Sequence, residues 1–311
     1  MKIIIAHTLS AELKDELQTK CPKAELIIVD KLTDAQNDLA NAEIIYASRF
    51  NTELLNASPK LKFLQAPYAG MNSMPLSALE ERGVLLANAR IHGETISELV
   101  LGMMIALSRN FPLAFKHQAD HSWTRLPQQS LQDATIAIVG VGVIGSHIAK
   151  RASAFGMKVL GFSRSGKPVE YVDESHTTDE LLQEIGRADY VVVACPLTPE
   201  THKMIDATVF EAMKKTSFIL NIGRGPIIDE LAMIAALEQG EIAGAGLDVF
   251  DIEPLPQDSP LWDMSNVLCF PHVAGSLDGN DLRAGRIFVD NVLNYLEGKP
   301  LRCAVDLKLG Y

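Results

Sequence analysis

The sequence predicts an α/β protein of two domains, each built around a parallel sheet. Short apolar runs alternate with polar, helix-compatible stretches from the first residue onwards, which is the pattern of βαβ units. The chain of 311 residues is long for one compact core, and its 47% hydrophobic content is ample for two. A glycine-rich turn at 140–145 lies in mid-chain, so a substantial domain precedes it. We therefore expect one doubly wound sheet behind this turn and a second α/β domain in front of it.

The first part of the chain predicts five strands, at 2–6, 25–29, 43–47, 63–66 and 84–87. Helix-compatible stretches such as 11–20 and 75–82 lie between them. A longer helix begins near Thr95, and Pro112 should kink or divide it. We expect this helix to pass from one domain to the other. Core packing explains its Met103-Met104 pair better than contact with a cofactor.

The alternation resumes after the glycine-rich turn, with strands expected at 158–162, 190–194, 217–221, 243–247 and 267–270. A last amphipathic helix covers about 278–296. It lies too far from the start of the second sheet to be only its next crossover, so we expect it to return to the first domain. The predicted domains are therefore 1–97 with 277–311, and 98–276.

Composition excludes several classes of partner. The net charge is -11 and the acidic residues are dispersed, which argues against binding to nucleic acid or to an anionic membrane and favours a small molecule. The four cysteines lie far apart without metal-ligand spacing, which predicts reduced thiols and no metal site. The opening residues are too short for a signal-peptide core, and no apolar stretch approaches the ~18 residues of a membrane span. We therefore expect a cytoplasmic protein.

The turn Gly140-Val141-Gly142-Val143-Ile144-Gly145 joins an apolar strand to a helix. Gly140 permits the tight turn, and Gly142 lets a pyrophosphate approach the backbone. Gly145 lets the helix pack closely on its strand, with the phosphates at the helix N-terminus. An ordinary glycine-rich turn is the alternative, but the flanking strand and helix favour a dinucleotide site in a Rossmann-type sheet.

The residues after the second strand of this sheet indicate whether the domain binds NAD(H) or NADP(H). An Asp or Glu there would accept hydrogen bonds from the adenosine ribose, whereas an Arg suits a 2′-phosphate. The chain carries Ser163, Arg164 and Ser165 at this place, with Lys167 nearby. Arg164 would hold a phosphate bidentately and the two hydroxyls would donate to it. The sequence therefore predicts NADP(H) in preference to NAD(H), and a solvated basic turn is the alternative.

Three residues that suit carbonyl reduction follow predicted strands in the second half: Arg224, Glu253 and His272. Ligands of open α/β sheets bind where the strands end, so these side chains can converge. Reduction of a keto acid needs a proton donor for the oxygen, which His272 supplies, and a cation for the carboxylate, which Arg224 supplies. Glu253 is the natural partner to orient the histidine. Each residue taken singly has an ordinary structural explanation in a loop or turn.

Three ordered segments follow the glycine-rich turn: Asn221 to Glu230, Gly244 to Pro254 and Pro271 to Gly275. Together with the turn they resemble the D-isomer-specific 2-hydroxyacid dehydrogenases over nearly the whole chain. Ser163-Arg164-Ser165 resembles the NADP-preferring branch of that family, which includes glyoxylate and hydroxypyruvate reductases. The resemblance implies a flavodoxin-like α/β substrate domain, formed by the N-terminal segment and the C-terminal helix, with the nucleotide domain between them.

The resemblance also implies roles for individual residues. Arg224 would anchor the substrate carboxylate and polarise the carbonyl, His272 would be the acid/base, and Glu253 its partner. The backbone N–H groups of Ala69, Gly70 and Met71 would bind the same carboxylate. The residues implied at the cofactor are Gly140, Gly142, Val143, Ile144, Gly145, Ser163, Arg164, Ser165, Cys195, Pro196, Thr201, Ile222, Gly223, Asp248 and His272.

Some positions depart from the family pattern or leave alternatives open. Asn72 stands where many members carry Asp, which puts the role of that side chain in doubt. Glu253 argues against formate dehydrogenases, which pair their histidine with Gln. The end at Tyr311 leaves no room for the regulatory domain of many phosphoglycerate dehydrogenases. The segment Ser48-Arg49-Phe50 either faces the substrate site or forms a surface turn, and the surface turn is favoured.

The sequence therefore predicts a cytoplasmic oxidoreductase that interconverts a 2-keto acid and a D-2-hydroxy acid with NADP(H). An NAD(P)-sensing, corepressor-like binding protein of the same fold is the alternative. The resemblance implies a homodimer, with residues 95–117 as a plausible contributor. The identity and bulk of the 2-keto acid stay open.

Overall fold

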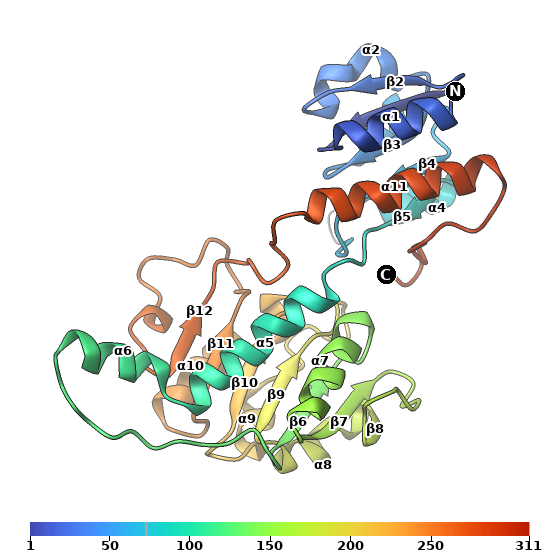
Figure 1. Cartoon of the computed structure of the whole chain (residues 1–311). Helices are drawn as coiled ribbons and strands as arrows, with labels where there is room; N and C mark the ends of the chain where they lie inside the picture. Colours follow the sequence, from blue (N-terminus) through green and yellow to red (C-terminus); the bar gives the residue numbers. More distant parts are fainter. Residues whose placement is uncertain (72–73, 311) are drawn as a thin grey trace. The chain divides into compact units, whose positions relative to one another are not determined.

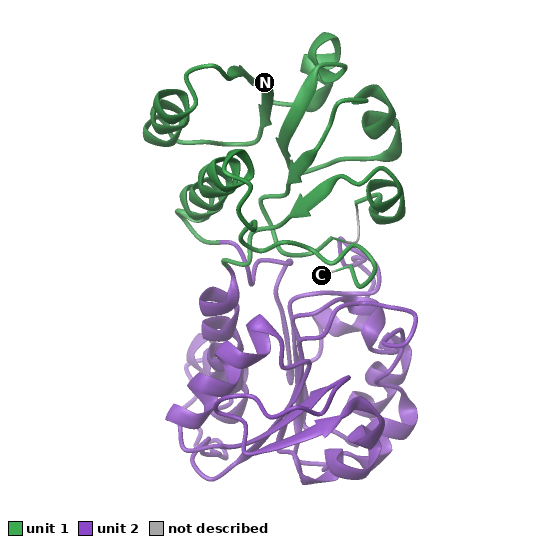
Figure 2. Cartoon of the chain, turned by 90° about the vertical axis from the view of Figure 1, so that its right-hand side faces the viewer, with its two compact units in different colours: residues 1–91, 277–311 green, residues 92–276 purple. Residues whose placement is uncertain are grey.

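The computed structural model describes residues 1–71 and 74–310. Contacts between residues divide the chain into two compact units, unit 1 comprising 1–91 with 277–311 and unit 2 comprising 92–276 (Figure 2). Each unit is an α/β structure around its own parallel sheet. The fold class predicted from the alternating pattern is confirmed.

Unit 1 contains a five-stranded parallel sheet with the strand order β2-β1-β3-β4-β5. Its strands are Lys2–Ala6 (β1), Glu25–Ile28 (β2), Ala42–Ala47 (β3), Phe63–Gln65 (β4) and Leu85–Ala87 (β5). Its helices are Ala11–Lys20 (α1), Gln36–Leu39 (α2), Thr52–Ala57 (α3), Leu76–Glu81 (α4) and Asn280–Leu296 (α11).

Alternate residues of β1 face opposite sides of this sheet, so each side has its own core. Ile3 and Ile5 pack with residues of α1 and α11, while Ile4 packs with residues of α2, α3 and α4. The helix α11 is also fixed by a buried polar contact, in which the Asn291 amide donates to Gln65 Oε1 of β4 at 2.8 Å. The last helix of the chain therefore belongs to the same layer as the first.

Unit 2 contains a seven-stranded parallel sheet with the order β12-β11-β10-β9-β6-β7-β8. Its strands are Thr135–Val139 (β6), Lys158–Ser163 (β7), Glu174–Thr177 (β8), Tyr190–Val193 (β9), Phe218–Asn221 (β10), Gly244–Leu247 (β11) and Val267–Cys269 (β12). Its helices are Gly93–Ser108 (α5), Phe111–Ala119 (α6), Val143–Ala154 (α7), Leu181–Glu184 (α8), Ala207–Ala212 (α9) and Glu230–Glu238 (α10).

Helices cover both faces of this sheet, as in a doubly wound fold (Figure 1). Residues of α5 and α7 pack on one face, and residues of α8, α9 and α10 pack on the other. Both Met103 and Met104 are buried in the first of these cores, as core packing predicts.

The long helix expected near Thr95 is two helices, α5 and α6, which are bent by 61°. Asn110 adopts a left-handed conformation at the break and Pro112 lies in the first turn of α6, where proline is tolerated. All of α5 belongs to unit 2, because its apolar face packs on α7 and on the sheet. The expected passage of this helix between domains was therefore wrong, and a boundary after residue 97 would cut it.

Within residues 1–71 and 74–310, no single helix is long and apolar enough to cross a membrane. Only α5 and α6 taken together reach that length and composition.

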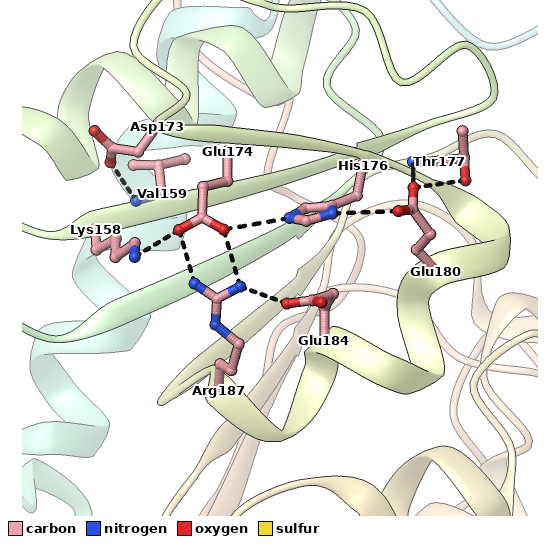
Figure 3. A network of polar contacts seen from close by, with 9 residues as sticks. All are labelled: Lys158, Val159, Asp173, Glu174, His176, Thr177, Glu180, Glu184 and Arg187. Carbon is pink, nitrogen blue, oxygen red and sulfur yellow. Dashed lines mark hydrogen bonds and ion pairs between the residues drawn. The ribbon is translucent and has the colours of Figure 1, made fainter.

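The edge strand β8 does not appear in the apolar pattern of the sequence, because its residues ESHT are polar. It pairs with β7, and ion pairs of its side chains surround it (Figure 3). Glu174 accepts from Arg187 and from Lys158 of β7, which lower its pKa to about 2. The His176 ring stacks on Phe162 of β7, with ring centroids 5.4 Å apart. Glu174, His176 and Glu184 offer atoms within 4.8 Å of one another, a spacing that suits a metal ion, but the Arg187 guanidinium already pairs with both carboxylates.

Candidate active site

The glycine-rich turn has the geometry that a dinucleotide site requires. Gly140 has φ +104°, and a Cβ there would lie 2.6 Å from the Cys195 backbone nitrogen, so only glycine fits. A Cβ on Gly145 would overlap the carbonyl oxygen of Gly140, which is why α7 can start so close to its strand. Gly142 caps α7 with open space around its Cβ position and no side chain bonded to the helix end. These residues fit a pyrophosphate at the N-terminus of α7, next to Val143 and Ile144.

The loops after β9 and β10 lie against this turn. A Cβ on Gly223 would lie 2.8 Å from the carbonyl oxygen of Cys195, so the two backbones are in contact. Thr201 Oγ1 donates to the Pro196 carbonyl at 2.7 Å and accepts from a backbone N–H, which fixes the loop that follows Cys195. Cys195 and Ile222 are buried. Burial raises the pKa of Cys195 to about 12, so its thiol stays neutral and packs rather than reacts.

The loop after β7 presents the residues predicted to choose the cofactor. Ser163 ends β7, and its hydroxyl accepts from the Gly166 N–H at 3.2 Å, which closes a tight turn. Arg164 and Ser165 on this turn are exposed. Hydrogen bonding from Thr198 is the largest cause that lowers the pKa of Glu200, and the positive charge of Arg164 adds a smaller contribution.

Arg224 is positioned by the end of β10. The Asn221 amide donates to the Arg224 carbonyl at 3.0 Å, and its oxygen accepts from the Gly223 N–H at 3.0 Å. The half-buried Arg224 side chain donates to the Gly223 carbonyl at 2.7 Å. Asn221 was recognised in the sequence only as the start of a motif, and its positioning role was missed. The sign that the sequence offers is a polar residue at the end of a buried strand, two residues before a glycine.

Glu253 and His272 meet in the structure. Glu253 Oε2 lies 2.7 Å from His272 Nδ1, and Glu253 Oε1 accepts from the Phe250 N–H at 3.1 Å. One carboxylate thus joins the loop after β11 to the loop after β12. His272 has φ +53°, a conformation that few non-glycine residues adopt, and 49% of its side chain is exposed.

Asp248 holds the backbone on which His272 sits. Its two carboxylate oxygens accept from the N–H groups of Val273 and Ala274, at 2.8 and 3.0 Å, and its carbonyl accepts from the His272 N–H at 2.9 Å. Burial raises the pKa of Asp248, and these two backbone donors oppose the shift. The sequence predicted Asp248 beside the cofactor, but this support of the His272 loop was missed.

Sheet register explains why these residues gather. Asn221 of β10, Leu247 of β11 and Cys269 of β12 lie in one row of paired residues. Asp248 follows directly on its strand, while Arg224 and His272 come three residues after theirs. All three therefore lie at the carboxyl edge of the sheet of unit 2, on which the glycine-rich turn also lies.

The loop after β4 in unit 1 contains the other predicted substrate residues. Ala69 and Gly70 are half-buried and Met71 is buried. The Asn88 amide donates to the Ala69 carbonyl at 2.8 Å, which fixes the loop from one side. No residue in the part of the chain that the structure describes accepts from the N–H groups of Ala69, Gly70 or Met71. These three donors are thus available to an anion, while Asn72 lies outside the described residues.

Comparison with known proteins places the chain in a family. The model of the NAD binding domain of the D-isomer specific 2-hydroxyacid dehydrogenases matches residues 101–274, and the model of their catalytic domain matches residues 3–139. The chain belongs to the D-isomer specific 2-hydroxyacid dehydrogenase family. It is an oxidoreductase with an NAD(P)-binding Rossmann domain, as the ordered motifs predicted, and the corepressor-like alternative is not favoured.

Individual relatives agree with this placement. A glyoxylate/hydroxypyruvate reductase B of Enterobacter sp. (strain 638) is 33% identical over 318 residues, covering 98% of this chain and 97% of the relative. The structure of an NADPH-dependent glyoxylate/hydroxypyruvate reductase from Sinorhizobium meliloti, in complex with NADP and sulfate, is 29% identical with a TM-score of 0.84 and covers 100% and 99% of the two chains. A family member from Xanthobacter autotrophicus Py2, in complex with NADPH and MES, is 28% identical with a TM-score of 0.87 and the same coverage.

Proposed function

We propose that this 2-hydroxyacid dehydrogenase reduces a small 2-keto acid to the D-2-hydroxy acid with NADPH, as a reductase of the glyoxylate/hydroxypyruvate type, and also runs the reverse reaction. The observation that carries the proposal is the Glu253–His272 pair on the same sheet edge as the glycine-rich turn. NADPH, when bound, supplies the hydride that adds to C2 of the keto acid. The two similar structures in complex with NADPH or NADP support this choice of cofactor.

The residues of unit 2 supply the proton and a positive charge. Because Glu253 accepts from Nδ1–H of His272, Nε2 is the nitrogen that gives a proton to the carbonyl oxygen and takes it back in the oxidation. The Glu253 carboxylate also stabilises the charged imidazolium. Arg224 binds the substrate carboxylate and polarises the carbonyl, with the Asn221 contacts holding its backbone. In unit 1, the N–H groups of Ala69, Gly70 and Met71 are the donors that we propose for a substrate carboxylate.

The assay that tests this function follows NADPH and NADH oxidation side by side with glyoxylate, hydroxypyruvate and bulkier 2-keto acids. We expect faster turnover with NADPH, and D-hydroxy acids as products. An enzyme that binds NADP tightly but reduces none of these acids would contradict the proposed reaction and favour a sensing role.

The phosphate-binding role of Arg164 gives a sharp prediction. Arg164→Ala removes a charge-assisted contact to the 2′-phosphate, so the KM for NADPH should rise roughly 10- to 100-fold while the KM for NADH changes little. Steady-state kinetics with both cofactors at saturating keto acid measure this. Lys215→Ala is the matched control, because it removes an exposed positive charge before the amino end of β10, at the opposite edge of the sheet. Equal effects of Arg164→Ala on both cofactors would refute the phosphate contact.

We also propose that the enzyme is a cytoplasmic homodimer. The four cysteines are free thiols, which suits a reducing compartment.

Large apolar side chains are exposed on and just after α6, with Phe115 65% and Trp123 99% exposed. Such a group of side chains is typical of a surface that a second copy covers. Light scattering after size-exclusion chromatography should give twice the chain mass, and Phe115→Glu should shift it toward the monomer. A monomeric unmodified enzyme would refute the dimer.

A further inference from the structure

Unit 1 contains a pocket of about 410 Å³ that the reaction described above does not use. Ser48, Arg49, Phe50, Asn51, Leu54 and Tyr68 line it. Its volume lies within the ~300–1,000 Å³ typical of small-molecule sites. The pocket begins where β3 ends, at Ser48, and includes Tyr68 from the loop after the paired strand β4. It therefore lies at the carboxyl edge of the sheet, where open α/β sheets bind ligands.

The position along this edge is also informative. The order β2-β1-β3-β4-β5 reverses direction between β1 and β3, and ligands of such sheets bind at this switch point. His7 follows β1, and its Nδ1 lies 3.1 Å from Ser48 Oγ. The Tyr68 hydroxyl donates to the Ser48 carbonyl. These contacts join the pocket to the loops on both sides of the switch point.

Arg49 contributes a positive charge to the lining of this pocket. Its side chain is exposed, and it has no hydrogen bond or ion pair to any residue among 1–71 and 74–310. Other arginines of unit 1 form ion pairs or hydrogen bonds, as Arg286 does with Glu16. None of the residues that line the pocket is acidic, so an incoming anion meets no bound carboxylate. An exposed arginine is usually only solvated, and its place on the pocket wall is what distinguishes Arg49.

The rest of the lining defines the kind of ligand. Phe50, Leu54 and Tyr68 offer apolar surface for a short carbon chain. Tyr68 directly precedes Ala69, Gly70 and Met71, whose N–H groups donate to no residue among 1–71 and 74–310 and suit the 2-keto carboxylate. We propose that the pocket takes the part of the substrate beyond C3 and that Arg49 binds a second anionic group there, so that the preferred 2-keto acids carry a distal carboxylate or phosphate. This inference rests on the proposed reduction of 2-keto acids.

Matched pairs of substrates test the inference with the full chain and NADPH. The pair 2-oxoglutarate and its neutral amide, 2-oxoglutaramate, tests a distal carboxylate, and 3-phosphohydroxypyruvate with hydroxypyruvate tests a distal phosphate. In at least one pair, the acid whose distal group is charged should have a kcat/KM roughly 10- to 100-fold higher than the acid whose distal group is neutral. The pair that shows the preference identifies the anion.

Variants then assign the preference to Arg49. Arg49→Gln should bring the anionic-to-neutral ratio of kcat/KM close to one, and Arg49→Lys should restore part of it. Because the ratio is measured within one preparation, it does not depend on the folded fraction. Lys62→Gln is the control, since it removes an exposed charge at the amino end of β4, and it should leave the ratio unchanged.

Failure of the inference can be told apart from failure of the proposed function. Reduction of glyoxylate without a preference in either pair would overturn the role of Arg49 alone. A preference that survives Arg49→Gln would do the same. No reduction of any 2-keto acid would overturn the proposed function and this inference with it.

Discussion

Replacing His272 by Gln is expected to lower kcat by roughly 10²- to 10⁴-fold, the usual contribution of a positioned general acid. Gln cannot give a proton to the carbonyl oxygen, whereas its size and polarity preserve much of the loop. The Kd for NADPH should stay nearly unchanged, because the glycine-rich turn and Arg164 do not depend on this side chain. Steady-state oxidation of NADPH at saturating glyoxylate measures kcat, and fluorescence titration measures the Kd.

Glu253→Gln is the companion variant, because Glu253 acts through His272. Gln keeps an oxygen that can accept from His272 Nδ1, where Glu253 now lies at 2.7 Å, but it loses the negative charge. The loss of kcat should therefore be smaller than for His272→Gln, because His272 keeps a hydrogen-bond acceptor at Nδ1. Unchanged turnover in His272→Gln would remove this residue from proton transfer, and a weakened Kd for NADPH would point to a disordered loop instead.

Features set by local sequence could be predicted well. The glycine-rich turn could be predicted because Gly140 and Gly145 leave no room for a Cβ. The atoms that a Cβ would meet lie close by in sequence or at the end of the neighbouring strand. The central strands follow from uninterrupted apolar runs, because parallel strands are buried on both faces. The pairing of Glu253 with His272 could be predicted because a carboxylate suits a histidine, and each residue lies in a loop that follows a strand at the same sheet edge.

Features set by distant contacts could not be predicted. The polar residues of β8 pair with β7, and Glu174 also binds Lys158 and Arg187, which lie elsewhere in the sequence. The supporting role of Asp248 depends on Val273 and Ala274, which lie on another strand's loop. The predicted domain boundary lies within α5 and not before it. An apolar helix face does not indicate which of two cores the helix packs against.

Arg49 illustrates the same limit at a candidate site. In the sequence it is one charged residue after a strand, for which a surface turn is the simplest interpretation. Only the packing of Tyr68 against Ser48 makes the turn one wall of a pocket. The pocket arises from two segments that the sequence keeps apart.

Gly225→Ala is expected to damage the site more than the fold. A Cβ at Gly225 would overlap the carbonyl group of Phe250, which is backbone and cannot rotate away. Either the loop with Arg224 or the loop after β11 must shift, at a cost of about 1–3 kcal/mol in the free energy of unfolding. The Phe250 N–H also donates to Glu253 Oε1, so one displacement reaches both Arg224 and the partner of His272. Misplacement by ~1 Å can cost roughly 10²-fold in rate, and we expect at least that loss in kcat/KM.

The control for Gly225→Ala is another glycine-to-alanine change in unit 2. Gly102 is exposed within α5, and a Cβ there meets nothing within 4 Å. Because alanine favours helix, Gly102→Ala should raise the free energy of unfolding by about 0.5–1 kcal/mol and leave kcat/KM unchanged. Thermal melting and steady-state kinetics on the two variants should thus move stability in opposite directions and activity in only one. Full activity in Gly225→Ala would mean that the two loops can separate without loss, so that Arg224 and Glu253 do not act as one positioned set.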